Sequence, residues 1–295
     1  MDYSKMDEKS VVEAILNGAG RSAVERMEVL RGVDYCIDKT QDEDIRIMTA
    51  NLLYAKWDSE DPELKKYPVR MKRVAECINL YKPDFVGMQE ARLMMREPLN
   101  EKLDTVYKYV NFDPPKRNAE WFPILYRTDR WTVVTSGTGE YKECIHPWGY
   151  VWATFSSLED ANDKITVMNL HYTLPNYASI DLTWGEFRND LAREINSFVK
   201  NHLIYNPNIP IAITGDYNTH RDSELYNVMV EDIAMESAGL VTDNSNMTEH
   251  HNRNTLDHIT VTTDLVDVIC HRCLDYYPSR TVSDHYHYFA DIKKK

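Results

Sequence analysis

The chain has 295 residues, and its 43% hydrophobic and 27% charged content is that of an ordinary globular protein, which excludes a disordered or fibrous chain. A formal net charge of −13 disfavours tight nonspecific binding to duplex DNA, because a negative field repels a polyanion. No apolar run reaches the length of a transmembrane helix, and the N-terminal "MDYSKMDEKS" lacks the apolar centre of a signal peptide.

The cysteines are odd in number and scattered, five in all, which is typical of a reducing compartment rather than of a disulfide framework. We therefore expect a cytoplasmic protein. With only 10 glycines and no Gly/Ser/Pro-rich linker, we also expect one compact main domain.

Residues 1–43 form a helical extension in this interpretation, ahead of a main domain at 44–295. Ser10 can cap a first helix that Gly18 ends, and the capping box from Ser22 to Glu25 begins a second. We expect these helices to pack on the main domain; the alternative is that they bind a partner.

The pattern then changes to short apolar strands separated by a few amphipathic helices. Lys82-Pro83 ends the first of these helices, whose apolar positions are Met71, Val74, Ala75 and Ile78. Two later helices carry Phe187, Leu191, Ile195 and Phe198, and Leu225, Val228, Met229 and Ile233. Strands are predicted at "DIRIMTANLLY", "DFVGMQE", "FPILYR", "WTVVTS", "VWATF", "KITVMNLHYT", "IPIAITGD", "TLDHITVT" and "YHYFADI". Because several strands follow one another without a helix, we expect two mixed sheets packed face to face, with helices outside.

Polar side chains stand at or near the ends of these strands. They are Asn51, Glu90, His171, Asp216, Asn218 and Asp257, with Asp284 and His285 just before the last strand. Each alone has an ordinary explanation as a turn former, a helix cap or a satisfied histidine. Together they supply carboxylates, amides and imidazoles at the rims of many strands, which indicates a functional site.

The chemistry of these groups is mutually compatible. Carboxylates without thiolates suit Mg²⁺ or Mn²⁺, with Glu90 as the natural ligand and Asn51 beside it. Asp257 is suited to orient His285, as a carboxylate fixes an imidazole tautomer. A metal, an oriented imidazole, a free carboxylate and an amide are the parts for in-line attack of water on phosphorus.

Seven blocks in order carry a resemblance: "TANLLY", "VGMQEAR", "AEWFPILYR", "MNLHYT", "TGDYN", "TLDHI" and "SDHYHY". This set resembles the endonuclease/exonuclease/phosphatase superfamily over about residues 44–292. The resemblance implies the α/β (α+β) class, as a four-layer α/β/β/α sandwich of two mixed sheets with outer helices and the active site at one edge. It also implies divalent-metal-dependent hydrolysis of a phosphoester.

The resemblance assigns a role to each motif residue. Asn51 and Glu90 are similar to the metal-site residues, and Asp284 to a second metal-side carboxylate. Glu120 would orient His171, which contacts the phosphate. Asp216 would position or deprotonate the attacking water, and Asn218 would hold the phosphate. Asp257 would pair with His285, which stabilises the transition state. The chain departs from the family pattern at Tyr217, His258 and His287, where Phe, Tyr and Pro are frequent.

Several functions remain open at this point. The leading one is a phosphodiesterase acting on a small molecule, a lipid headgroup or nucleic acid; the alternatives are a sugar or inositol phosphatase and a non-catalytic phosphate-binding module. Tyr172 and Tyr177 could line the cleft and Arg188 could bind phosphate, though a core position or a surface salt bridge is an equal explanation. "CHRC" at 270–273 is a weak zinc signal, because structural zinc needs four ligands.

Overall fold

The computed structural model describes residues 38–58, 66–113, 115–140, 149–172, 184–241, 255–274 and 282–295. The two helices expected within residues 1–43 lie outside these ranges, as do Tyr177 and the loops at 173–183 and 242–254.

Two six-stranded sheets form the centre of the molecule. The first has the order β11 (Val266–Cys273), β12 (Tyr288–Lys294), β1 (Ile45–Asn51), β2 (Phe85–Gln89), β4 (Ile124–Arg127) and β3 (Tyr107–Tyr109). The second has the order β5 (Trp131–Glu140), β6 (Gly149–Ser157), β7 (Lys164–His171), β8 (Ile211–Asp216), β10 (Asp257–Thr262) and β9 (Met235–Ser237). In each sheet one central pair is parallel, β1 with β2 and β7 with β8, and the other pairs are antiparallel. The expectation of mixed sheets is confirmed.

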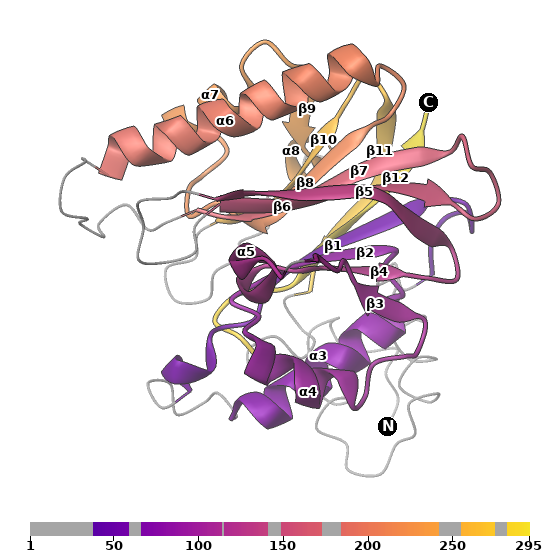
Figure 1. Cartoon of the computed structure of the whole chain (residues 1–295), viewed down its shortest axis with the longest axis vertical. Coiled ribbons are helices and arrows are strands. Elements are labelled where there is room, and N and C mark those ends of the chain that lie inside the picture. The colour runs from indigo at the N-terminus through magenta and orange to yellow at the C-terminus, as the bar shows by residue number, and fades with distance from the viewer. Residues whose placement is uncertain are drawn as a thin grey trace, which may run out of the picture.

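Helices cover the outer face of each sheet (Figure 1). The first sheet carries α3 (Tyr67–Tyr81) and α4 (Leu93–Asn100), and the second carries α6 (Trp184–Tyr205) and α7 (Glu224–Val230). The short elements η2 (Ala55–Trp57), α5 (Arg117–Trp121) and α8 (Ala238–Val241) connect strands. None of the described helices combines the length and apolarity needed to cross a membrane.

The helix α3 illustrates how the sequence builds a layer. Pro68 occupies its first turn, where no backbone donor is required, and Lys82 ends it in the left-handed conformation with φ of 47°. Its apolar stripe, from Met71 to Ile78, packs against Met48 and Val86 on the outside of the first sheet.

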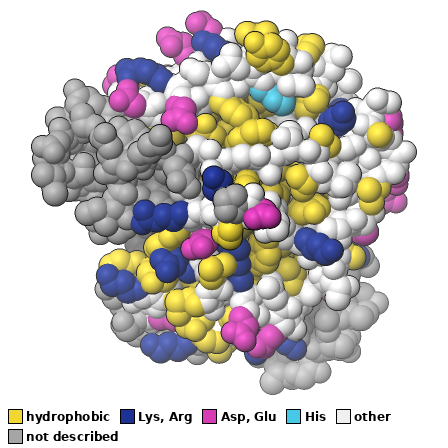
Figure 2. Space-filling view, viewed as in Figure 1, with side chains coloured by type: hydrophobic (Ala, Val, Ile, Leu, Met, Phe, Trp, Pro, Cys, Tyr) yellow, Lys and Arg dark blue, Asp and Glu magenta, His cyan; other side chains and the backbone are white. Residues whose placement is uncertain are grey.

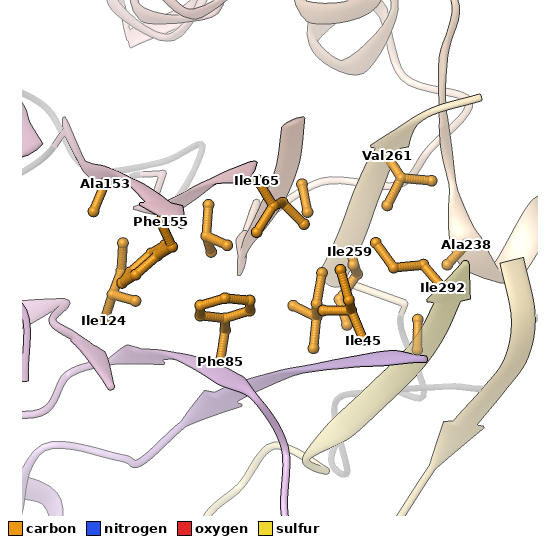
Figure 3. Close-up of a cluster of buried hydrophobic side chains, with 14 of the residues drawn as sticks. Ile45, Phe85, Ile124, Ala153, Phe155, Ile165, Ala238, Ile259, Val261 and Ile292 are labelled. Atoms are coloured by element: carbon orange, nitrogen blue, oxygen red, sulfur yellow. The ribbon is translucent and has the colours of Figure 1, made fainter. Parts of the chain in front are cut away.

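Besides the two apolar clusters that lie under the outer helices of each sheet, a third lies between the two sheets (Figure 3). Ile45, Phe85 and Ile124 come from the first sheet, and Phe155 and Ile259 from the second. Three apolar layers therefore alternate with two sheets, which is the four-layer α/β/β/α sandwich expected from the sequence.

One polar bridge interrupts the apolar layer near the strand ends. The amide of Gln89 on β2 donates to Asn169 Oδ1 on β7 at 2.6 Å, and the Thr214 hydroxyl on β8 donates to the same oxygen at 3.0 Å. Gly87 lies against this bridge, and a Cβ added there would stand 1.9 Å from Thr214 Oγ1. The bridge thus fixes the first sheet against the second just below the residues at the strand ends.

Candidate active site

The strand registers bring the polar strand ends together. Asn51 is paired with Gln89, next to Glu90, across the parallel strands β1 and β2. In the second sheet Asp216 is paired with His171 on one side and with Asp257 on the other. Because the two sheets are packed face to face, these ends meet at one edge of the sandwich.

Asp216 is the centre of the arrangement. Its Oδ2 accepts a hydrogen bond from Asn51 Nδ2 at 3.0 Å, and the same oxygen lies 3.5 Å from His171 Nε2 and 3.8 Å from His285 Nε2. Its Oδ1 accepts from the backbone of Asn218 at 2.8 Å. One carboxylate therefore touches residues from both sheets and faces two imidazoles.

His285 is held by a buried carboxylate. Asp257 Oδ2 lies 2.7 Å from His285 Nδ1, so that Nδ1 carries the proton and Nε2 faces Asp216. The backbone of His285 also donates to the Ser283 hydroxyl at 3.2 Å. The predicted pairing of Asp257 with His285 is present, and it orients the imidazole as a carboxylate does in hydrolytic sites.

Glu90 has a left-handed backbone with φ of 60°, which a β-branched or charged residue rarely adopts without support. Its Oε2 accepts from the backbone of Tyr54 at 2.6 Å, and its Oε1 accepts from Asn51 Nδ2 at 3.3 Å. Asn51 Oδ1 in turn accepts from the backbone of Leu53 at 3.0 Å. These bonds hold Glu90 and Asn51 beside Asp216, with the amide nitrogen of Asn51 facing both carboxylates.

Arg70 fixes the loop after β1, and the sequence analysis missed it. Its guanidinium donates to the carbonyls of Leu52 at 2.5 Å, Leu53 at 2.9 Å and Val282 at 2.5 Å, and pairs with Asp58 at 2.6 Å. The available signal is a charged residue on the apolar stripe of α3, four positions before Val74. A buried arginine there must find several acceptors, which only the site loops supply.

The turn after β8 is held from within. Asn218 adopts φ of 47°, and its Nδ2 donates to the Tyr172 carbonyl at 2.7 Å. Arg188 donates to the carbonyls of Asn218 at 2.8 Å and Tyr217 at 3.3 Å and is only 8% exposed. These described contacts of Arg188 stabilise the turn that carries Asn218, and phosphate binding by Arg188 stays a prediction.

Tyr172 also differs from the expectation. Its ring is 1% exposed and packs edge-on against Tyr217, with centroids 5.9 Å apart. It belongs to the core beneath the site and offers no surface on which a base or sugar could stack. Tyr217 is fully buried, as expected for the residue between Asp216 and Asn218.

The predicted pairing of Glu120 with His171 has no hydrogen bond to support it among the described residues. Glu120 is half-buried on α5 and lines a cavity beside the site. Its negative charge acts to raise the pKa of Arg96, which lines the same cavity. Asp284 is half-buried next to His285 and accepts from the Ser283 hydroxyl at 3.3 Å.

Burial and charge act oppositely on the titration of this site. Burial alone would lower the pKa of His285, but the Asp257 and Asp216 carboxylates raise it well above 6.5. Burial would also lower the pKa of His171, but the hydrogen bond and the charge of Asp216 outweigh burial and raise this pKa above its usual value. Burial would raise the pKa of Asp216, and the charges of His285 and His171 overcome this and lower it to about 2. The site therefore holds an ionised Asp216 carboxylate between two imidazoles, and its charge favours the protonated form of both.

Comparison with known proteins agrees with the geometry. The sequence profile described as Endonuclease/Exonuclease/phosphatase family matches residues 48–285. The chain belongs to the endonuclease/exonuclease/phosphatase family. The family consists of metal-dependent phosphoester hydrolases, so this chain has the fold and active-site frame of such an enzyme. Among curated proteins the sequence finds no match.

Solved structures of family proteins share the fold at low identity. An endonuclease/exonuclease/phosphatase from Bacteroides vulgatus is 23% identical, with a TM-score of 0.69, covering 85% of this chain and 99% of that one. A mannosyl-6-phosphatase from Bacteroides thetaiotaomicron is 21% identical, with a TM-score of 0.70, covering 84% and 99%. TDP2 from D. rerio, complexed with a single-strand DNA product, is 16% identical, with a TM-score of 0.63, covering 85% and 100%.

The donor atoms fit the divalent metal that the family typically uses. Glu90 and Asp216 present carboxylate oxygens on either side of the Asn51 amide nitrogen, and no thiolate is among them, which suits a hard cation. Ligand atoms of Asp216, Asp257 and His285 also lie within 4.8 Å of one another, and this is the one such group among the described residues. Within that group His285 Nδ1 is bonded to Asp257, so the imidazole is also oriented by this carboxylate.

The departures from the family pattern lie in the core. His258 Nε2 is 3.0 Å from the Thr219 carbonyl, and its ring packs on Tyr217 and Tyr226. His287 is fully buried, and neither ring nitrogen has a hydrogen-bond partner. Neither residue lines the cleft.

Proposed function

We propose that the protein is a Mg²⁺- or Mn²⁺-dependent phosphodiesterase that hydrolyses its ester by in-line attack of water. The observation that carries the proposal is the Asp216 carboxylate, buried at the meeting point of both sheets and flanked by His171, His285 and Asn51. The five cysteines of the chain are odd in number and scattered, and we propose the cytoplasm as the compartment of this activity for that reason.

Each side chain has a place in this reaction. Asp216 Oδ2 accepts a hydrogen bond from the attacking water and directs its oxygen at phosphorus. The Nε2 protons of His171 and His285 donate to phosphoryl oxygens, where negative charge increases in the transition state. Glu90 and Asn51, with Asp284 as the second carboxylate of the family pattern, would hold a divalent cation, which would supply further positive charge there.

The low pKa of Asp216 defines its role more closely. A carboxylate with a pKa of about 2 is fully ionised at neutral pH in the protein without substrate. Such a carboxylate orients water well but is a weak base. Phosphoryl transfer asks mainly for positioning and charge stabilisation, because its transition state is loose. We therefore place the transfer of the water proton to Asp216 after the new P–O bond has begun to form.

A phosphomonoesterase is the second candidate. The structural likeness to a mannosyl-6-phosphatase favours it, while the likeness to TDP2 with its single-strand DNA product favours a diester. The net charge of −13 makes duplex DNA the least favoured diester. A phosphate-binding module without turnover is disfavoured because Asp216, His285 and Glu90 are all in place.

The test compares bis(p-nitrophenyl) phosphate with p-nitrophenyl phosphate in Mg²⁺, Mn²⁺ and EDTA. We expect metal-dependent release of p-nitrophenol, faster from the diester, and a loss of roughly 10²–10⁴-fold in kcat for Asp216→Asn and for His285→Ala. Asp267→Asn is the matched control, because this exposed carboxylate on β11 contacts only Lys295 at 3.4 Å among described residues.

Each result discriminates between the candidates. Faster monoester hydrolysis would establish the phosphatase alternative. Folded protein with no metal-dependent turnover of either ester would leave only the binding module. Near-wild-type kcat in either site variant would show that the assigned roles are wrong.

A further inference from the structure

A cavity of about 670 Å³ lies beside the active site, between α4, β3 and the start of α5. Its walls carry three cations, Arg96, Lys108 and Lys116, against two carboxylates, those of Asp104 and Glu120. This local excess of positive charge contrasts with a chain whose net charge is −13. Figure 2 shows Lys and Arg side chains, together with some Asp and Glu, interspersed with hydrophobic ones over the lower half of the molecule, the half that contains α4.

Arg96 is the informative residue of this cavity. Its guanidinium donates to the carbonyls of Ala91 and Ala119 and stacks over the ring of Tyr109, 4.8 Å from the ring centre. No carboxylate lies within ion-pair distance of it among the described residues. Burial lowers its pKa, and Tyr109 and the carboxylate of Glu120 oppose this effect from a greater distance. A half-buried guanidinium that forms no ion pair among the described residues is costly, and an anion bound in the cavity would lower that cost.

The other two cations of the cavity lining are exposed to solvent. Lys108 is exposed on β3 and Lys116 is exposed just before α5. Phe112, half-buried, adds an apolar wall. A half-buried planar guanidinium with two exposed ammonium groups in the same lining suits a phosphate, which presents several oxygens to several donors.

The cavity is adjacent to the catalytic residues along the chain and in space. Ala91 directly follows Glu90, and Ala119 directly precedes Glu120, whose side chain lines the cavity. Arg96 Nε lies 3.3 Å from the Ala91 carbonyl oxygen, so it is at most about 10 Å from the Glu90 Cα by backbone geometry. A small molecule can span such a distance with two phosphates.

We propose that this cavity binds a second phosphate of the same substrate whose first phosphate is hydrolysed at Asp216. The proposal rests on the proposed function and narrows it: the substrate is a compact molecule with at least two phosphates. Lys108, Lys116 and Arg96 bind the phosphate that is not cleaved, and thereby position the other.

The test uses two esters that differ only by one phosphate. Thymidine 5′-(p-nitrophenyl phosphate) and its 3′-phosphorylated derivative release the same p-nitrophenol. We expect wild-type protein with Mn²⁺ to prefer the 3′-phosphorylated ester at least about tenfold in kcat/KM. The Lys108→Ala/Lys116→Ala variant should reduce this ratio to near one, whereas Lys200→Ala, on α6 in the opposite outer layer, should leave the ratio as in wild type.

Equal kcat/KM for the two esters in wild type would overturn the proposal, and so would a preference that persists in the double variant. If neither ester is hydrolysed, the proposed function fails, and a binding measurement then tests separately whether the cavity binds a phosphate. Calorimetry in EDTA would then compare thymidine 3′,5′-bisphosphate with thymidine 5′-phosphate. Tighter binding of the bisphosphate that is lost in the double variant supports the cavity, and equal binding refutes it.

Discussion

Arg92 stands at the rim of the site, held by aromatic rings rather than by an acid. Arg92 follows Glu90 by two residues in the sequence. Its guanidinium lies 4.4 Å from the ring centre of Trp121 and 5.6 Å from that of Tyr54. Among the described residues no carboxylate pairs with it. Stacking on two rings fixes the cation and leaves its N–H edge available for an anionic substrate.

We expect Arg92→Ala to raise KM for a phosphodiester about tenfold while changing kcat less, because Arg92 binds substrate and transition state alike. Arg92→Lys should recover only part of the loss, since an ammonium cannot stack as a planar guanidinium does. Steady-state kinetics with Arg193→Ala as control, an exposed arginine on α6 paired with Asp190, checks this. A fall in kcat at unchanged KM would place Arg92 in the chemical step instead.

The residues at the strand ends could be predicted from sequence, and those that support them could not. Asp216, Asp257 and His285 interrupt apolar strands, so their types and positions already indicate chemistry. Arg188 and Tyr172 carry no such mark. The role of Arg188 depends on carbonyls 29 and 30 residues away, which only the folded chain brings near. Tyr172 follows His171 in sequence, yet the turn of the chain directs its ring into the core.

At the scale of elements, buried apolar strands were predictable and weakly patterned ones were not. The nine predicted strands correspond to β1, β2, β4, β5, β6, β7, β8, β10 and β12. The strand β11 was missed because it is only partly buried and its residues alternate less regularly. The helix α4 was missed because Pro98 lies inside it and no side chain caps its start.

The "CHRC" motif lies on β11, which explains why it does not form a metal site. Cys273 packs between the two sheets, whereas Cys270 packs against the outer cluster with α3. Residues three apart on a strand point to opposite faces, so a spacing that suits a zinc knuckle separates the two sulfurs here. The Cys-x-x-Cys spacing therefore does not indicate a metal site when the two cysteines lie on a strand.

The close approach of the two sheets at Gly87 leads to a second prediction. Gly87→Ala would place Cβ 1.9 Å from Thr214 Oγ1 and 2.5 Å from Asn169 Oδ1, both of which belong to a buried hydrogen-bonded bridge. We expect a loss of about 1–3 kcal/mol in the free energy of unfolding, measured by urea denaturation.

The control for this overpacking is Gly137→Ala on β5. There the nearest atom is Trp152 Nε1 at 2.8 Å, on a half-buried ring that can move, so the loss should be smaller. Equal destabilisation by the two substitutions would indicate a backbone effect common to glycines in strands, and not a steric contact between the sheets.

At the scale of the whole molecule, the buried histidines fall into two electrostatic groups. His171 and His285 face carboxylates and have raised pKa values. At His258, His271 and His287 burial outweighs the nearby charges, including that of Asp216 at His258, and lowers the pKa of each to about 4. The second group makes the fold acid-sensitive, because in the unfolded chain these imidazoles take up protons near pH 6.5.

His287 isolates this effect. Its folded-state pKa of about 4 lies below 6.5, so the unfolded chain binds more protons in between and stability falls as the pH drops through that window. From pH 7 to pH 5 this single residue should cost about 2 kcal/mol. Because neither of its ring nitrogens is hydrogen-bonded, a leucine of similar size should replace it without leaving a polar group unpaired.

We therefore expect His287→Leu to gain about 2 kcal/mol over wild type between pH 7 and pH 5, whatever its difference at pH 7. Urea denaturation at both pH values measures this, with His220→Leu as the control because His220 is exposed. Parallel pH dependences for His287→Leu and wild type would mean that His287 takes up its proton equally in the folded and unfolded chains. The acid sensitivity of the fold would then have to come from His258 and His271, whose rings pack against tyrosines.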